Sequence, residues 1–363
     1  MKYISRRIKL VLIPINSASI AFDPISYDLN HPADRRKFCY FANAINLKYE
    51  IYDPKKEYDL VIISETSDIS YWSRKKKVPK IIFNLNDSYL AEGLSFISSL
   101  RGLAKFISRQ SKYLEIDFAS TLKKMCRRAD AVICSTPIQK KTIEEYCKNT
   151  HIMFDAHFSE INMKKQDFTA HKPFRLIWEG LPTNLYQLAY FSKLICQSNL
   201  QDYIDLNVVT DKYTYNLMNR FLKVDTQEYL KRMEIKSHFH EWSIKNLQEI
   251  SINSDLAIIP IDINNPMMIG KPENKLLLFW RMGLPTLVSA TPSYQHAMKM
   301  SNQNYFIKDD SEWISSIKEL MESKEKRINA GEKGYEYVTK NYNKNEFLKR
   351  WESIFESVGY SIY

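Results

Sequence analysis

Short continuous runs of hydrophobic residues, each closed by polar ones, mark the first half of the chain. Residues 58–66 (YDLVIISET) and 78–87 (VPKIIFNLND) have this form, and residues 129–136 (ADAVICST) repeat it. The runs lack the alternation of a strand with one face in water, so each predicts a strand buried on both faces. Amphipathic segments such as residues 34–46 (DRRKFCYFANAIN) lie between them and predict helices.

The N-terminal run at residues 8–15 (IKLVLIPI) follows a basic start, as in a signal peptide. It contains Pro14, and no convincing small-residue cleavage site follows it. We therefore expect it to be the first buried strand. A long helical region is expected at residues 96–128.

A second series of strands and helices begins at residue 174. Further strands are expected at residues 205–211, 238–242, 255–262 and 304–310. A helix is expected at residues 213–221, and more helices from residue 311 onward. Together the two series predict an α/β fold with two doubly wound, Rossmann-like domains, residues 1–160 and 172–340, joined by a linker near residues 158–172.

Length and composition agree with two soluble domains. The 363 residues exceed one ordinary core, and 44% are hydrophobic against 26% charged. No run approaches the roughly 18–20 apolar residues that span a bilayer. Five cysteines, odd in number and widely spaced without a C-x-x-C pair, indicate reduced thiols in a cytoplasm.

The net charge of +10 favours an acidic partner. Most basic clusters lie in the first half, for example residues 74–77 and 123–128, which suits an anionic inner-membrane surface. They equally suit solvated surface lysines. Nucleic acid is disfavoured, because glycines and aromatic residues are not interleaved with the basic residues.

Ligands of open parallel sheets collect at the carboxyl ends of the strands, so polar residues at strand ends are candidates. The first half offers Glu65, Asp87 with Ser88, and Ser135 with Thr136. The second half offers Glu179 with Gly180, Thr210, Asp211, His240, Asp262 and residues 270–275.

Residues 269–295 predict a loop, a helix, a glycine stop and a strand. Gly283 follows the last helical residues and precedes Pro285, as expected of a residue that ends a helix in the left-handed conformation. Before the helix stand Gly270, Lys271, Pro272, Glu273, Asn274 and Lys275. Cations at a helix N-terminus indicate an anion site there.

Residues 241–262 (EWSIKNLQEISINSDLAIIPID) and 271–289 (KPENKLLLFWRMGLPTLVS) resemble the donor domain of GT-B glycosyltransferases. The resemblance is to the bacterial surface-polysaccharide kind, which acts in capsule, O-antigen and exopolysaccharide synthesis. Residues 31–53 and 127–143 are similar to acceptor-domain segments of the same enzymes. The resemblance implies that a C-terminal helix, residues 341–363, packs back on the first domain.

The resemblance also implies roles for the donor-domain residues. The segment from Gly270 to Lys275 would bind the ribose and phosphates of a nucleotide sugar, with Glu273 on the ribose diol and Lys271 or Lys275 on phosphate. Pro272 fits the first helical turn. The further donor-binding candidates are Gly180, Thr210, Asp211, His240, Trp242, Asp262 and Asn274. Retaining members often carry two glutamates eight positions apart. Here the residue eight positions before Glu273 is Asn265 and the residue eight positions after it is Arg281, so the pair is absent. Whether transfer retains or inverts the configuration of the sugar therefore stays open.

The first domain would bind the acceptor, a growing and lipid-linked glycan. An inverting enzyme needs a general base on the acceptor hydroxyl, and Asp87, Glu65 and His157 are the candidates. His31, Arg35 and Arg36 are candidates for contact with acceptor phosphate. Each also has an ordinary structural interpretation as a capping, surface or helix-start residue.

No cofactor is expected, and no metal, because no D-x-D triplet is present. Helix dipoles and lysines would stabilise the leaving phosphate instead. The same fold leaves two enzymatic alternatives, a sugar-nucleotide 2-epimerase and a CDP-alcohol phosphotransferase. A non-catalytic nucleotide-sugar-binding assembly partner is the third. The expected location is the cytoplasm, peripheral on the inner membrane face.

Overall fold

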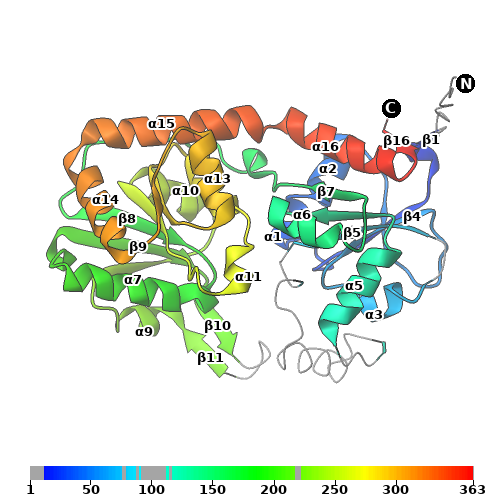
Figure 1. Cartoon of the computed structure of the whole chain (residues 1–363), viewed down its shortest axis with the longest axis horizontal. Helices are drawn as coiled ribbons and strands as arrows, with labels where there is room; N and C mark the ends of the chain where they lie inside the picture. The colour runs from blue at the N-terminus through cyan, green and yellow to red at the C-terminus, as the bar shows by residue number, and fades with distance from the viewer. Residues whose placement is uncertain are drawn as a thin grey trace, which may run out of the picture. The chain divides into compact units, whose positions relative to one another are not determined.

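The computed structural model describes residues 12–75, 79–86, 90, 112–113, 117–216 and 222–362. The chain divides into two units (Figure 1), the first ending at Asp155 and resuming at Asn345, the second covering Ala156–Lys344. The chain passes into the second unit after Asp155 and returns to the first unit after Lys344. The boundaries expected from the sequence were residues 160 and 341. Residues 158–172, expected as a linker, fall in the second unit.

The first unit is built on a parallel sheet of six strands in the order β3-β2-β4-β5-β6-β7. Its central strands are buried on both faces, and residues 60–63 have no exposed surface. From β2 the chain adds β3 on one side and then β4 to β7 on the other, so the topological switch point lies between β2 and β4. The strands are β2 (Ile20–Asp23), β3 (Glu50–Ile51), β4 (Leu60–Ser64), β5 (Lys80–Asn84), β6 (Ala131–Cys134) and β7 (Thr150–Ile152).

Several helices of the first unit start at side-chain caps, such as Asp117 before α5 and Thr136 before α6, whereas Lys37 before α2 makes no such hydrogen bond. They are α1 (Pro32–Arg35), α2 (Phe38–Ala44), α3 (Ile69–Trp72), α5 (Phe118–Arg128), α6 (Pro137–Ile143) and α16 (Lys344–Ser357). Of the long helix expected at 96–128, the described part is α5 with residue 117 and the pair 112–113. The single helix expected at residues 34–46 is wrong, because Lys37 (φ −119°, ψ −101°) interrupts it. Its ammonium points inward to Asn86 and lies 3.8 Å from Asp155.

The first strand of the sheet is not the one expected at residues 8–15. Within the described part of that run, Ile13–Pro14 form a short strand, β1, which pairs with β16 (Tyr360–Ser361) outside the main sheet. Ile13 is 52% exposed, and a 3-10 turn at Ile15–Ser17 follows. Pro14 lacks the N–H that a central strand must donate. The run IAFD at Ile20–Asp23 takes the inner position instead.

Helix α16 belongs to the first unit. The ring of Trp351 stacks on Phe41 at 5.0 Å and lies 5.8 Å from Phe38. Phe355 also stacks on Phe41, at 5.3 Å, and lies 5.9 Å from Trp351. The C-terminal helix therefore supplies aromatic side chains to the core under α2.

The second unit has a parallel sheet in the order β12-β9-β8-β13-β14-β15, which is the Rossmann order 3-2-1-4-5-6. Its switch point lies between β8 and β13. The strands are β8 (Phe174–Glu179), β9 (Ile204–Thr210), β12 (Ser237–Glu241), β13 (Leu256–Ile259), β14 (Thr286–Ser289) and β15 (Phe306–Ile307).

Helices cover both faces of this sheet. Leu176 and Ile258 belong to one core cluster, while their neighbours Ile177 and Ala257 belong to another on the opposite face. The first cluster includes residues of α7 (Leu185–Gln197), α9 (Thr226–Leu230) and α14 (Asp310–Glu322). The second includes residues of α10 (Ile244–Ile252), α12 (Asn274–Arg281), α13 (Pro292–Met300) and α15 (Lys324–Asn341), while α11 (Pro266–Ile269) precedes α12.

The helix expected at residues 213–221 is wrong. Tyr213–Asn216 form strand β10, which pairs antiparallel with β11 (Leu222–Asp225). Tyrosine and threonine in alternation favour a strand over a helix. Among the described residues, no helix is both long enough and apolar enough to cross a bilayer.

Candidate functional site

A cluster of charged and aromatic side chains lies at the switch point of the second sheet. Strand β8 ends at Glu179, and the chain continues through Gly180. Lys275, in the first turn of α12, donates a 2.8 Å hydrogen bond to the carbonyl oxygen of Glu179. The N-terminus of α12 and the end of β8 are thus tied together.

The ammonium of Lys275 is enclosed. It lies 5.2 Å from the centroid of the Trp178 ring. A Cβ atom at Gly180 would fall 2.5 Å from this nitrogen and 2.7 Å from the Trp178 ring, so only glycine fits. Burial lowers the pKa of Lys275; Glu179 opposes this shift and Lys271 adds to it. The charge of Lys271 therefore acts on the Lys275 ammonium.

Trp242 fixes the carboxylate of Glu179. Its indole Nε1 donates to Glu179 Oε1 at 3.1 Å, and its backbone N–H donates to the carbonyl of Thr210 at 2.9 Å. The ends of β8, β9 and β12 are joined in this way.

A second carboxylate, Glu273, lies at the N-cap of α12. Its Oε1 accepts a 3.0 Å hydrogen bond from the hydroxyl of Tyr342. Burial raises the pKa of Tyr294, and the charges of Glu273 and Glu179 raise it further. Both carboxylates therefore act on one buried phenol. Sequence reasoning named Glu179 only as a strand end and missed Tyr294 and Tyr342.

The segment before α12 differs in detail from the sequence prediction. The helix begins at Asn274, so Pro272 precedes the N-cap instead of occupying the first turn. Lys271 donates its backbone N–H to Met268, which closes the short helix α11. Gly270 is buried. The helix ends as predicted, with Gly283 at φ +66°.

The remaining donor-side candidates are spread along the edge. Thr210 Oγ1 is buried with no hydrogen-bond partner in the described part of the chain. Burial and the charge of Glu241 raise the pKa of Asp211. His240 Nε2 lies 3.0 Å from Asn207 Oδ1 on the neighbouring strand, and burial lowers the pKa of His240. Asp262 accepts the backbone N–H of Asn264 at 3.0 Å in a turn.

In the first unit, Glu65 directly follows β4 and is buried, and its carboxylate accepts a 2.8 Å hydrogen bond from the backbone N–H of Asn86. His31 caps α1, its Nδ1 accepting from Ala33 N at 3.3 Å. Arg35 ends that helix, and Arg36 is 7% exposed.

Asp87 and Ser88 lie outside the described residues. His157 is buried in a 3-10 turn (His157–Ser159) of the second unit, so it does not share a unit with Glu65. In the described ranges, no group of three or more His, Cys, Asp or Glu side chains is placed to hold a metal ion.

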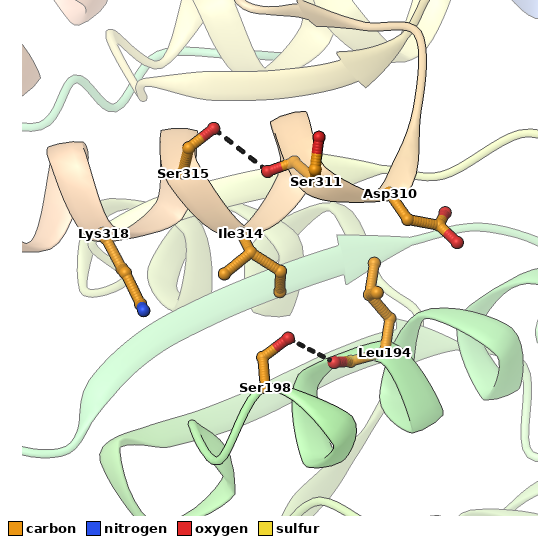
Figure 2. Close-up of a pocket in the computed structure, with 7 residues that line it drawn as sticks. All are labelled: Leu194, Ser198, Asp310, Ser311, Ile314, Ser315 and Lys318. Atoms are coloured by element: carbon orange, nitrogen blue, oxygen red, sulfur yellow. Dashed lines mark hydrogen bonds between the residues drawn. The ribbon is translucent and has the colours of Figure 1, made fainter.

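A shallow pocket of about 400 Å³ lies elsewhere on the second unit, between α7 and α14. Figure 2 shows Leu194 and Ser198 facing Ile314 and Lys318 across it. Its serine hydroxyls bond back to their own helices, Ser198 to Leu194 at 3.0 Å and Ser315 to Ser311 at 3.1 Å. None of the candidate site residues lines it.

Comparison with solved structures gives matches over most of the chain. A crystal structure of TarM matches 82% of this chain and 54% of its own, with a TM-score of 0.54 and 8% identity. A mutant of S. aureus TarM, in complex with Fondaparinux, alpha-GlcNAc-glycerol and UDP, gives a TM-score of 0.56 at 8% identity over 82% of this chain and 55% of its own. The chain has the GT-B fold.

Other matches agree with this fold. The N-terminal domain of Candida albicans trehalose-6-phosphate phosphatase gives a TM-score of 0.54 at 13% identity, covering 88% of this chain and 73% of that one. The apo structure of OtsA gives 0.51 at 11% identity, covering 82% and 72%. The chain spans about half the length of the TarM chains it matches. No protein-family model matches the sequence, and neither does any curated protein.

Proposed function

We propose that this protein is a glycosyltransferase that transfers a sugar from a nucleotide-activated donor to a bacterial surface glycan. One observation carries the proposal. In a GT-B fold, the switch point of the second sheet gathers two carboxylates, two lysines and an indole around the N-terminus of α12. This is the edge at which an open parallel sheet binds its ligand.

Each group has a role that its chemistry suits. The carboxylate of Glu273 accepts hydrogen bonds from the ribose diol of the nucleotide. Lys271 and Lys275, with the N-terminal N–H groups of α12, stabilise the negative charge that develops on the leaving phosphate. Trp242 and His240 border the base. This assembly makes transfer independent of a divalent metal, which is part of the proposal.

The acceptor side of the proposal rests on the first unit. His31, Arg35 and Arg36 contact the acceptor. The proton of its hydroxyl is removed by Glu65 or Asp87, or by His157 of the second unit. The TarM complex contains UDP together with alpha-GlcNAc-glycerol, so a protein of this fold holds both a nucleotide and a small glycoside. We further propose that the acceptor is lipid-linked and that basic residues of the first unit meet the anionic inner face of the membrane.

A thermal-shift screen tests the donor site. The purified full chain is heated with UDP-, GDP-, dTDP-, CDP- and CMP-linked sugars, with and without EDTA. A ligand at about a hundred times its dissociation constant adds roughly 2.7 kcal/mol to the free energy of unfolding. We expect one nucleotide class to stabilise the protein equally in both buffers.

Variants locate the effect. Glu273→Gln and Lys271→Met should reduce the shift, whereas Lys318→Met, in the pocket between α7 and α14, should keep it. Turnover of the stabilising donor with glycan acceptors then tests transfer. Absence of a shift with every donor would contradict the proposal, and donor binding without transfer to any acceptor would favour a non-catalytic binding protein.

A further inference from the structure

The first unit carries a group of aromatic and basic side chains that the proposed donor site does not use. Tyr52 follows the carboxyl end of β3, and Tyr71 lies on α3, which follows β4. Lys75 comes just after α3. The Lys75 ammonium donates to both phenol oxygens, to Tyr71 at 3.1 Å and to Tyr52 at 3.4 Å, and the two phenol oxygens lie 3.1 Å apart.

This group is anchored to the switch point of the first sheet. Trp72, beside Tyr71 at a centroid distance of 5.2 Å, donates its indole N–H to Asp23 Oδ2 at 3.1 Å. Asp23 is the last residue of β2. Because ligands of open parallel sheets bind at the carboxyl side of the switch point, the group is positioned where a ligand of this unit would lie.

A second lysine reaches the same ring. The backbone N–H of Lys112 donates to Asp68 at 2.7 Å, and that of Tyr113 donates to Ser70 at 3.1 Å, which holds both residues against the start of α3. The Lys112 ammonium lies 5.4 Å from the Tyr71 ring, and so does that of Lys75. Arg74 lies over the Tyr113 ring at 4.4 Å.

The two lysines of this group bring positive charge to the Tyr71 ring. In the described part of the chain, neither the Lys75 nor the Lys112 ammonium contacts a carboxylate. Burial raises the pKa of the Tyr71 hydroxyl, but its hydrogen bonds with Tyr52 and Lys75 and the charges of the two lysines together outweigh burial, so the pKa is lowered. Two ammonium groups within 5.4 Å of one ring centre concentrate positive charge there, which favours a bound anion.

We propose that Lys75 and Lys112, around Tyr71, form a binding site for an acidic saccharide that carries carboxylate or phosphate groups. The lysines pair with the acidic groups, the phenol hydroxyls of Tyr52 and Tyr71 hydrogen-bond sugar hydroxyls, and the partly exposed ring of Tyr113 packs against the sugar. The site defines the acceptor of the proposed transferase as an acidic glycan, and in that role the inference rests on the proposed function.

A saccharide suits this site better than a membrane does. The ammonium of the half-buried Lys75 and that of the exposed Lys112 each lie 5.4 Å from the half-buried ring of Tyr71, so both charges are directed at one place instead of along a helix face. A membrane would be met more readily by the basic side of α5, where Lys124 is exposed.

Isothermal titration of the full chain tests the site with hexagalacturonate, mannose 6-phosphate and neutral maltohexaose. Vesicles with and without phosphatidylglycerol are titrated in parallel. We expect the two acidic saccharides to bind and maltohexaose not to. Lys75→Met and Lys112→Met should each weaken binding roughly tenfold, the usual effect of losing a charge-assisted hydrogen bond.

Matched variants separate charge from fold. Lys75→Arg keeps the charge and should retain most of the affinity, and Lys124→Met removes one charge elsewhere in the same unit and should change nothing. Unchanged acidic-saccharide binding in both methionine variants would overturn the proposal. So would binding of phosphatidylglycerol vesicles, and not of saccharides, that is lost with Lys75.

Nucleotide binding, measured on the same samples, keeps the two proposals apart. The methionine variants should bind the stabilising nucleotide as the wild type does, because that site lies in the second unit. Acidic-saccharide binding without any nucleotide binding would reject the transferase and keep this site. Nucleotide binding without acidic-saccharide binding would reject this site and keep the transferase.

Discussion

The hydroxyl of Tyr342 donates a 3.0 Å hydrogen bond to the carboxylate of Glu273, across 69 positions of sequence. Tyr342 is the C-cap of α15, and Arg281 donates to its carbonyl oxygen at 2.8 Å. The end of α15 therefore holds both ends of α12. A residue outside the strand edge therefore helps to set the orientation of the Glu273 carboxylate.

Removing this hydroxyl should weaken nucleotide binding. In Tyr342→Phe the ring stays in place but Glu273 loses a donor, and we expect roughly tenfold weaker binding of the nucleotide that stabilises the protein most. Calorimetric titration measures the dissociation constant, and thermal melting in the absence of ligand checks that the fold is retained.

A double-mutant cycle shows whether the tyrosine acts through the carboxylate. Adding Tyr342→Phe to Glu273→Gln should weaken nucleotide binding much less than Tyr342→Phe does in the wild type, because the acceptor of the hydrogen bond is already altered. Fully additive losses would mean that Tyr342 affects binding by another route.

Gly180→Ala should disturb the same site at the end of β8. The added methyl would meet Lys275 Nζ and the Trp178 ring at less than 3 Å. We expect about 1–3 kcal/mol of destabilisation from overpacking, together with weaker nucleotide binding. Chemical denaturation and titration measure the two effects.

Gly331→Ala is the matched control for that variant. Its methyl would meet the carbonyl oxygen of Gly283 at 2.3 Å and the Phe168 ring at 2.9 Å, on α15 and away from the β8 edge. It should lower stability while leaving the nucleotide affinity of the folded protein unchanged. Equal losses of affinity in both variants would argue that Gly180 matters only for stability.

The sequence predicts this fold well because its strands are buried on both faces. Residues 60–63 and 256–259 are continuous apolar runs, and both became central strands. The prediction failed where the pattern was short or mixed. IAFD at Ile20–Asp23 is too brief to stand out beside the longer run at residues 8–15, and the hairpin at Tyr213 lacks a strong apolar period.

The candidate site was predictable only in part. The approach to α12 shows in the sequence, because glycine, proline and lysines precede an apolar helix. The partners do not show. Trp242 reaches Glu179 across 63 positions, so no local spacing reveals the pair. Such contacts depend on the order of strands in the sheet, which a single sequence leaves undetermined. The roles of Glu65, Asp87 and His157 stay predictions.

Lys275 should make stability depend on pH. Burial lowers its pKa in the folded state, so between that value and the unfolded value near 10.4 the unfolded chain binds more protons. The free energy of unfolding contributed by this group therefore rises with pH through that window and is lowest below it. Lys275→Met should remove the rise.

Denaturation from pH 7 to 10.5 measures the difference between wild type and variant at each pH. As pH increases, the free energy of unfolding of the wild type should rise relative to that of Lys275→Met. Lys245→Met, which removes an exposed lysine from α10, gives the baseline for losing one charge. A wild-type advantage that shrinks with rising pH would show that Lys275 is stabilised in its charged form.

Trp351 should hold the first unit together although it lies near the end of the chain. It is 1% exposed and packs on Phe41 and Phe38 of α2. Trp351→Ala should lower the free energy of unfolding by about 3–5 kcal/mol, because the cavity adds to the lost transfer energy. Hydrogen exchange should show faster opening of α2 and of the β2–β4 region, with α7 and β8 unchanged. Trp351→Phe keeps a ring against Phe41 and should lose less. Equal exchange increases in the second unit would mean that α16 supports both units and not the first alone.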